Sequence, residues 1–99
     1  MPFVQLIEFQ TNRIGEFDAA LDDWLKESEG QRNATRGLRT KDRDRADTYV
    51  QIVEFPSYQE AMANSALPET AELAEKLARL CDSPPTFRNL DVRQVDSFS

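Results

Sequence analysis

The sequence predicts an α+β fold of the ferredoxin-like type, in which the element order βαββαβ builds a four-stranded antiparallel sheet with the helices on one face. The first observation behind this prediction is an internal repeat, because residues 4–9 (VQLIEF) recur as residues 50–55 (VQIVEF). The second is that a helix-start signal follows each copy. The third is size: 99 residues, of which 39% are hydrophobic and 30% charged, fit a single domain over residues 1–99.

The first half of the chain predicts strand, helix, strand. Residues 4–9 form the first strand, and residues 11–12 (Thr-Asn) signal the start of a helix. Gly30 can end that helix in a left-handed turn, after which residues 35–41 predict a shorter, more polar strand. Residues 42–47 are charged and predict a solvated hairpin loop. The helix itself is predicted by an apolar stripe of Ile14, Phe17, Leu21, Trp24 and Leu25.

The second half repeats the pattern with a longer helical part. Ser57 and Glu60 form a capping box that begins a short helix ending near Asn64. Pro68 suits a first helical position and begins a longer helix, which residues 82–85 (DSPP) end. The apolar side of that helix is formed by Leu73, Leu77 and Leu80.

The last predicted strand, residues 87–95, is irregular. In a regular strand, side chains two residues apart share a face, but Phe87 has an odd number and Leu90 and Val92 have even numbers. The apolar side chains would therefore switch from one face to the other along this strand. A bulge in the strand would produce such a shift, so we expect one there.

The two repeated strands are central neighbours in this topology, and their faces separate by period-two alternation. Both faces are largely apolar but the helices can cover only one, so we expect a homodimer in which a second copy covers the other. The face expected under the helices carries Phe3, Gln5, Ile7, Phe9, Tyr49, Gln51, Val53 and Phe55. The face expected in the dimer interface carries Val4, Leu6, Val50 and Ile52, with Glu8 and Glu54 at the strand ends.

Polar residues on these faces are the candidates for function. Gln5 and Gln51 lie on an apolar face, where an amide without hydrogen-bond partners costs roughly 1–3 kcal/mol. They therefore either line a pocket or bond to each other or to the backbone. Glu8 and Glu54 fall at opposite ends of antiparallel strands, which favours ion pairing over an acid–base dyad. The available partners are Arg36, Arg39, Arg88 and Arg93.

Composition narrows the chemistry further. The chain contains no histidine and one cysteine, Cys81, which removes the usual imidazole base, the Ser–His and Cys–His nucleophile pairs and nearly every zinc constellation. We therefore expect no metal site and no cofactor, and we interpret Cys81 as a small core residue. The formal net charge of -6 disfavours a nucleic-acid partner.

The start of the chain gives no targeting or membrane signal. Residues 1–8 contain no basic region and reach a carboxylate at Glu8, unlike a signal peptide. No apolar run in the sequence approaches the length of a membrane span. We therefore expect a cytoplasmic protein with no membrane partner.

Residues 50–62 (VQIVEFPSYQEAM) resemble the third strand and following short helix of the dimeric α+β barrel proteins. That superfamily includes the antibiotic-biosynthesis-monooxygenase-like domains, the haem-degrading monooxygenases and the stress-responsive barrel domains. Residues 61–70 (AMANSALPET) are similar to a segment of uncharacterised actinobacterial members. The resemblance implies that the sheets of two subunits face each other as a barrel. It also implies that each subunit keeps a pocket between its helices and its sheet.

The resemblance further implies a function. Cofactor-independent monooxygenases of the superfamily hold an aromatic or polyketide-like substrate with an amide on the third strand, usually asparagine, and an aromatic residue four positions later, usually tryptophan. Gln51 and Phe55 occupy those positions here. The haem-degrading branch holds iron through an axial histidine, which this chain lacks. The alternative is a non-catalytic dimeric module that binds a small hydrophobic ligand or acts in a stress response.

The substrate-binding residues expected from the pocket face and the resemblance are Gln5, Trp24, Tyr49, Gln51, Phe55 and Tyr58. Two of them keep a second interpretation. Trp24 is otherwise a core residue between helix and sheet, and Tyr58 is otherwise a packing residue with its hydroxyl in water. No residue is assigned a catalytic role from the sequence.

Overall fold

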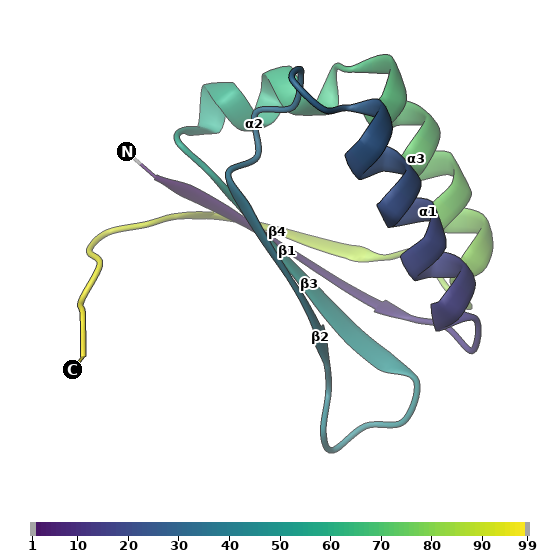
Figure 1. Cartoon of the computed structure of the whole chain (residues 1–99). Helices are drawn as coiled ribbons and strands as arrows, with labels where there is room; N and C mark the ends of the chain where they lie inside the picture. The colour runs from purple at the N-terminus through teal and green to yellow at the C-terminus, as the bar shows by residue number, and fades with distance from the viewer. Residues whose placement is uncertain (1, 99) are drawn as a thin grey trace.

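The computed structural model describes residues 2–98 and confirms the predicted ferredoxin-like α+β class. Four antiparallel strands form one sheet in the order β2-β3-β1-β4, and three helices lie on one of its faces (Figure 1). No helix within these residues combines the length and apolar character needed to span a membrane. The elements are β1 (Phe3–Gln10), α1 (Ile14–Glu27), β2 (Arg36–Lys41), β3 (Thr48–Phe55), α2 (Tyr58–Ser65), α3 (Pro68–Leu80) and β4 (Thr86–Asp91).

Strands β1 and β3 are the central pair, as the internal repeat predicts. Their antiparallel register places Phe3 opposite Phe55 and Phe9 opposite Tyr49. Because side chains alternate between the faces of a sheet, all four aromatic residues point to the helix-covered face. The other face is called the open face. It carries Val4, Leu6, Val50 and Ile52 from the central strands and Leu38 and Leu90 from the edge strands.

Helix α1 carries the predicted apolar stripe, on which Phe17 is buried. The helix ends at Glu27, earlier than the predicted end at Gly30. Its last turn is closed by Ser28, whose backbone N–H and hydroxyl both donate to the Trp24 carbonyl, at 2.9 and 2.6 Å. Gly30 lies in the turn that follows, and its φ of 81° is the left-handed conformation that glycine adopts at little cost.

Helices α2 and α3 begin where their start signals predict. The Ser57 hydroxyl accepts a hydrogen bond of 3.1 Å from the backbone N–H of Glu60, which is half of a capping box. The Glu60 carboxylate instead accepts a 2.6 Å hydrogen bond from the Asn33 amide, so α2 is tied to the segment that precedes β2. Pro68 occupies the first position of α3, where its missing N–H costs nothing.

Strand β4 is shorter than predicted, and the expectation of a bulge in it is wrong. It ends at Asp91, and all six of its residues pair with β1 without interruption. The parity shift arises because β4 is an exposed edge strand, where burial does not enforce alternation. Phe87 lies on the helix-covered side and Leu90 on the open face, and they remain 56% and 43% exposed. After a last hydrogen bond of 3.0 Å from the Val92 N–H to the Pro2 carbonyl, residues 93–98 lead away from the sheet (Figure 1).

The buried core divides into two clusters, one at each end of the central strands. The Phe3 cluster consists of Phe3, Phe55 and Ala61. The Phe9 cluster consists of Phe9, Phe17 and Leu21. In the second cluster the Phe9 and Phe17 rings stack with centroids 4.1 Å apart. The helices are thereby fixed to the sheet at two separate places.

We expect Phe17→Ala to lower the free energy of unfolding by about 3–5 kcal/mol, because it removes a ring that is only 2% exposed and stacked on Phe9. Chemical denaturation followed by circular dichroism measures the change. The matched control is Phe98→Ala, which removes a ring that is 95% exposed and should change the free energy of unfolding by less than about 0.5 kcal/mol. Equal effects of the two substitutions would contradict the packing described.

Candidate functional site

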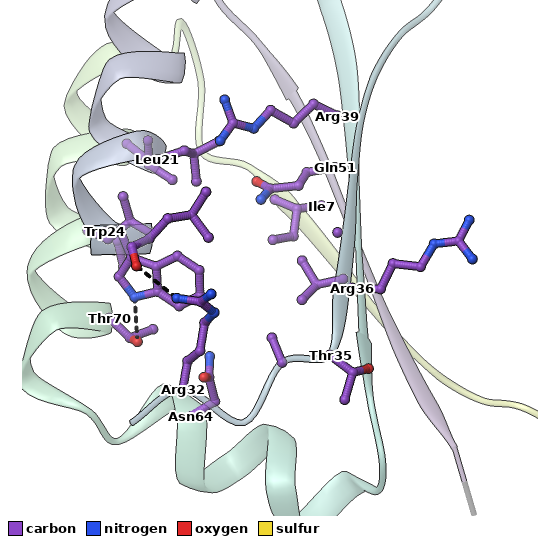
Figure 2. Close-up of a pocket in the computed structure, with 17 residues that line it drawn as sticks. Ile7, Leu21, Trp24, Arg32, Thr35, Arg36, Arg39, Gln51, Asn64 and Thr70 are labelled. Atoms are coloured by element: carbon purple, nitrogen blue, oxygen red, sulfur yellow. Dashed lines mark hydrogen bonds between the residues drawn. The ribbon is translucent and has the colours of Figure 1, made fainter. Parts of the chain in front are cut away.

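A cavity of about 340 Å³ lies between the helical layer and the sheet (Figure 2). Its volume falls within the range of roughly 300–1,000 Å³ that is typical of ligand pockets. The sheet contributes Ile7, Gln51 and Val53, which lie in the middle of the helix-covered face, between the Phe3 and Phe9 clusters. Helix α3 contributes Leu73 and Leu77 to the facing wall. The cavity is therefore a mostly apolar space with a few polar groups in its lining.

Trp24 of α1 is fixed in the wall of this cavity. Its indole Nε1–H donates a hydrogen bond of 3.0 Å to the Thr70 hydroxyl, which links α1 to α3. The Arg32 guanidinium lies over the indole ring, 5.9 Å from the ring centroid. Trp24 is half-buried, so it fills space between the helices and also presents part of its surface to the cavity. Its contact with a ligand stays a prediction.

The two candidate glutamines have different surroundings. Gln5 lies beside β4, where its side-chain N–H donates a hydrogen bond of 3.2 Å to Oδ1 of Asn89. The Gln51 side chain is directed into the cavity and bonds to none of the other residues drawn around it (Figure 2). Gln51 is therefore the amide available to a ligand of this cavity, whereas Gln5 lies outside its lining.

Tyr49 lies beside the main cavity rather than in its lining. Its ring stacks on Phe9 with centroids 5.6 Å apart. It lines a second, smaller cavity of about 140 Å³, which Gln51 also lines. Gln51 therefore borders both cavities, whereas Tyr49 borders the smaller one.

Phe55 and Tyr58 lie at the end of the sheet, away from the cavity lining. Phe55 is four residues beyond Gln51, roughly 13 Å along a strand, which places it in the Phe3 cluster. Tyr58 packs edge-on against Phe3 with ring centroids 5.4 Å apart and is 52% exposed. The structure thus brings Gln51 together with Trp24 but not with the aromatic residues that follow it in sequence.

None of the three arginines that line the cavity, Arg32, Arg36 and Arg39, is among the site residues predicted from the sequence. Arg39 lies on the helix-covered side because it is opposite Gln51 in the β2–β3 register. It therefore pairs with Asp22 of α1 at 2.9 Å and with Asp18 at 3.6 Å, rather than with a carboxylate of the open face. The alternation of side chains along β2 could have predicted that Arg39 lies on the helix-covered face. Arg32 follows α1 in a segment without periodicity, so no sequence signal pointed to it.

Glu8 and Glu54 form separate ion pairs at opposite ends of the open face. Glu54 lies 3.1 Å from Arg36, one of its predicted partners. Glu8 lies 3.1 Å from Arg45, which belongs to the turn predicted as a solvated loop. Arg45 also pairs with Asp42 at 3.0 Å, so this guanidinium ties the turn to β1. The two glutamates therefore have structural partners and do not form an acid–base dyad.

Cys81 is half-buried beside the Phe9 cluster, which agrees with its interpretation as a small core residue. Burial, aided by the negative charge of Asp82, raises the pKa of its thiol above the usual value. Residues 2–98 contain no group of three or more histidine, cysteine, aspartate or glutamate side chains placed to hold a metal ion.

The fold and this cavity define a class of protein, a ferredoxin-like α+β domain with a ligand-sized space between its helices and its sheet. No protein-family model matches the sequence, and no curated protein matches it. Solved structures of antibiotic biosynthesis monooxygenases share its fold, which confirms the architectural resemblance seen in the sequence. At sequence identities below one fifth, these likenesses describe the fold alone.

Three of these structures illustrate the likeness. SnoaB, a cofactor-independent oxygenase from Streptomyces nogalater, aligns with a TM-score of 0.79 over 95% of each chain at 18% identity. Rv0793 from Mycobacterium tuberculosis aligns with a TM-score of 0.80 over 98% of this chain and 100% of its own at 13% identity. An antibiotic biosynthesis monooxygenase aligns with a TM-score of 0.74 over 95% of this chain and 100% of its own at 14% identity.

We expect Cys81 to react slowly with iodoacetamide near neutral pH. A thiol whose pKa is raised holds less of the reactive thiolate at any pH below that pKa, so the rate should increase with pH beyond the range in which a free cysteine levels off. Mass spectrometry of the alkylated protein over time measures the rate. The same protein unfolded in guanidinium chloride is the control and should react faster; equal rates in the two states would contradict the burial.

Proposed function

We propose that this protein is a cofactor-independent, monooxygenase-like enzyme that acts on an aromatic or polyketide-like small molecule bound in the cavity. The observation that carries the proposal is the Gln51 amide, directed into a mostly apolar, ligand-sized cavity with Trp24 on the facing wall (Figure 2). The fold shared with the cofactor-independent oxygenase SnoaB supports the same function.

The lining suits a flat ring system. Apolar side chains such as Ile7, Leu73 and Leu77 favour an apolar ligand by removing its surface from water. Trp24 offers a large surface held in place by its bond to Thr70, so little conformational entropy is lost when a ring packs on it. The Gln51 amide can donate to a carbonyl or phenolate oxygen on the ring and fix its orientation.

The proposed reaction converts an activated methylene group, such as that of an anthrone, to a ketone. A methylene proton passes to water and leaves a carbanion whose charge is shared with the ring oxygen. The carbanion passes electrons to O2 and forms a carbon–oxygen bond as a peroxide anion, which takes a proton back from water. The resulting hydroperoxide loses water to give the carbonyl. One oxygen atom stays in the product and the other leaves as water, with the substrate carbon as the source of all the electrons. The Gln51 N–H would stabilise the charge on the ring oxygen.

A non-catalytic ligand-binding module is the second candidate, and one observation favours it. Among the residues that line the cavity, the ionisable side chains are Arg32, Arg36 and Arg39. Arginine stays protonated near neutral pH, so none of them can accept the methylene proton. An enzyme with this site must rely on the acidity of its own substrate, whereas a binding module needs no proton acceptor.

We expect the purified protein to accelerate oxygen uptake by anthrone and Gln51→Leu to reduce that acceleration by about 100-fold, because the substitution removes the hydrogen bond to the developing oxyanion. An oxygen electrode and the absorbance of anthraquinone measure the reaction. Gln59→Leu makes the same change on the exposed side of α2 and should keep the wild-type rate.

Binding is measured separately through Trp24, the only tryptophan of the chain, whose fluorescence should change when a ligand enters the cavity. If anthrone changes this fluorescence but oxygen uptake does not increase, the enzymatic proposal is refuted and the binding module is left as the proposed function. Anthrone that changes neither would remove both.

We also propose that the open face is the interface of a homodimer. Val4, Leu6, Val50 and Ile52 form a contiguous apolar strip on it and are half-exposed in the single chain. Exposed apolar patches rimmed by polar residues mark interaction sites, and ion pairs lie at both ends of this strip. A second copy of the chain would present the same strip and so provide a self-complementary cover.

We expect Ile52→Lys to convert the dimer to a monomer at micromolar concentration, because it places an unpaired charge in the middle of the apolar strip. Size-exclusion chromatography with light scattering measures the molar mass. Ala63→Lys adds the same charge on the exposed side of α2 and should leave the dimer intact. A wild-type protein that is monomeric under these conditions would refute the interface.

A further inference from the structure

Arg32 differs from the other two arginines of the cavity lining in having no carboxylate partner among residues 2–98. Arg39 pairs with Asp22 at 2.9 Å, and Arg36 pairs with Glu54 at 3.1 Å. The Arg36 side chain also points away from the cavity (Figure 2). The positive charge that remains for an occupant of the cavity is therefore that of Arg32.

The guanidinium of Arg32 is held in place by neutral groups. Its Nη1 donates to the Leu25 carbonyl at 2.8 Å and to the Ser28 hydroxyl at 3.4 Å. Its central carbon lies over the Trp24 ring, 5.9 Å from the ring centroid. These contacts fix the position of the group but do not compensate its charge.

Free donors remain on this guanidinium. Both of its hydrogen bonds use Nη1, which leaves the N–H groups of Nε and Nη2 without a partner among residues 2–98. Arg32 is half-buried at a cavity whose walls are mostly apolar. A partly desolvated charge with unused donors in such a place favours an anion, which a planar guanidinium can bind through two parallel hydrogen bonds.

We propose that the cavity selects a flat aromatic acid, with its anionic oxygen atoms on Arg32 and its ring system packed against Trp24. This inference shares the cavity of the proposed function but does not depend on the reaction with oxygen. It adds a charge requirement to the ligand: a carboxylate or an ionised phenol is preferred to a neutral ring of the same shape.

The net charge of the protein makes a preference for an anionic ligand informative about Arg32. The formal net charge is -6, so the average field of the protein repels anions. A preference for an anionic ligand over its neutral isostere must therefore come from a local contact.

The test compares 2-naphthoate with 2-naphthamide, which share a ring system and shape but differ in charge. Isothermal titration calorimetry gives the two dissociation constants, and the NMR signal of the single indole N–H shows whether each probe reaches Trp24. We expect the wild-type protein to bind the naphthoate about 10- to 100-fold more tightly than the amide, because hydrogen bonds to charged groups are stronger than neutral ones.

Arg32→Gln should abolish that preference by weakening naphthoate binding while 2-naphthamide binds as before. The unchanged amide affinity serves as the internal check that the cavity is intact. Arg79→Gln alters the net charge by the same amount on the exposed side of α3 and should keep the wild-type preference. Should Arg32→Gln lose both probes through misfolding, Arg32→Lys decides the matter, because it keeps the charge but lacks the planar fork and should retain part of the preference.

The outcomes separate this inference from the proposed function. Equal affinity of the wild-type protein for both probes would overturn the role of Arg32 while leaving ligand binding in the cavity intact. A preference that survives Arg32→Gln, or that is the same in Arg32→Lys and wild type, would also overturn it. Failure of both probes to shift the Trp24 signal would overturn the inference together with the binding step of the proposed function.

Discussion

Aromatic side chains at both ends of the central strands determine how the helical layer meets the sheet. The Phe3 cluster fixes α2 at one end, and the Phe9 cluster fixes α1 at the other. Between them the same strands carry Ile7, Gln51 and Val53, which have less bulk than the rings on either side. The helices are therefore held at a distance set by the rings, and the smaller side chains leave the space beneath them open. The cavity follows from the order of side-chain sizes along two strands.

The ionisable side chains that line the cavity are opposite in sign to the net charge of the whole protein. The chain carries a formal net charge of -6, yet the ionisable side chains of the cavity lining are all arginines. Arg39 is compensated by its ion pairs with Asp22 and Asp18, and Arg36 lies opposite Glu54 in the strand register and pairs with it on the open face. The net charge of the protein therefore does not identify the ligand, because Arg32, in the segment after α1, is the guanidinium of the cavity lining that has no carboxylate partner among residues 2–98.

Patterns within single elements were sufficient to predict the fold but only part of the site. The repeat and the Ser57 capping box depend on neighbours in sequence, so the central strand pair and α2 could be predicted. Alternation placed Gln5 and Gln51 on one face but could not distinguish them, because their difference depends on Asn89 of β4 lying beside Gln5. The contact of Phe55 with a substrate stays a prediction, and the structure places Phe55 in the Phe3 cluster, outside the cavity lining, because it lies four residues beyond Gln51 along β3.

The cavity and the open face are coupled because they are two sides of the same strands. Gln51 is directed into the cavity, while its neighbours Val50 and Ile52 lie on the open face. A slip of one residue in the β1–β3 register would exchange the two sets and turn the amide outward. The cross-strand pairs Phe3–Phe55 and Phe9–Tyr49 oppose such a slip, since it would move buried rings from both clusters to the open face. The aromatic residues that create the cavity therefore also keep its polar group in place.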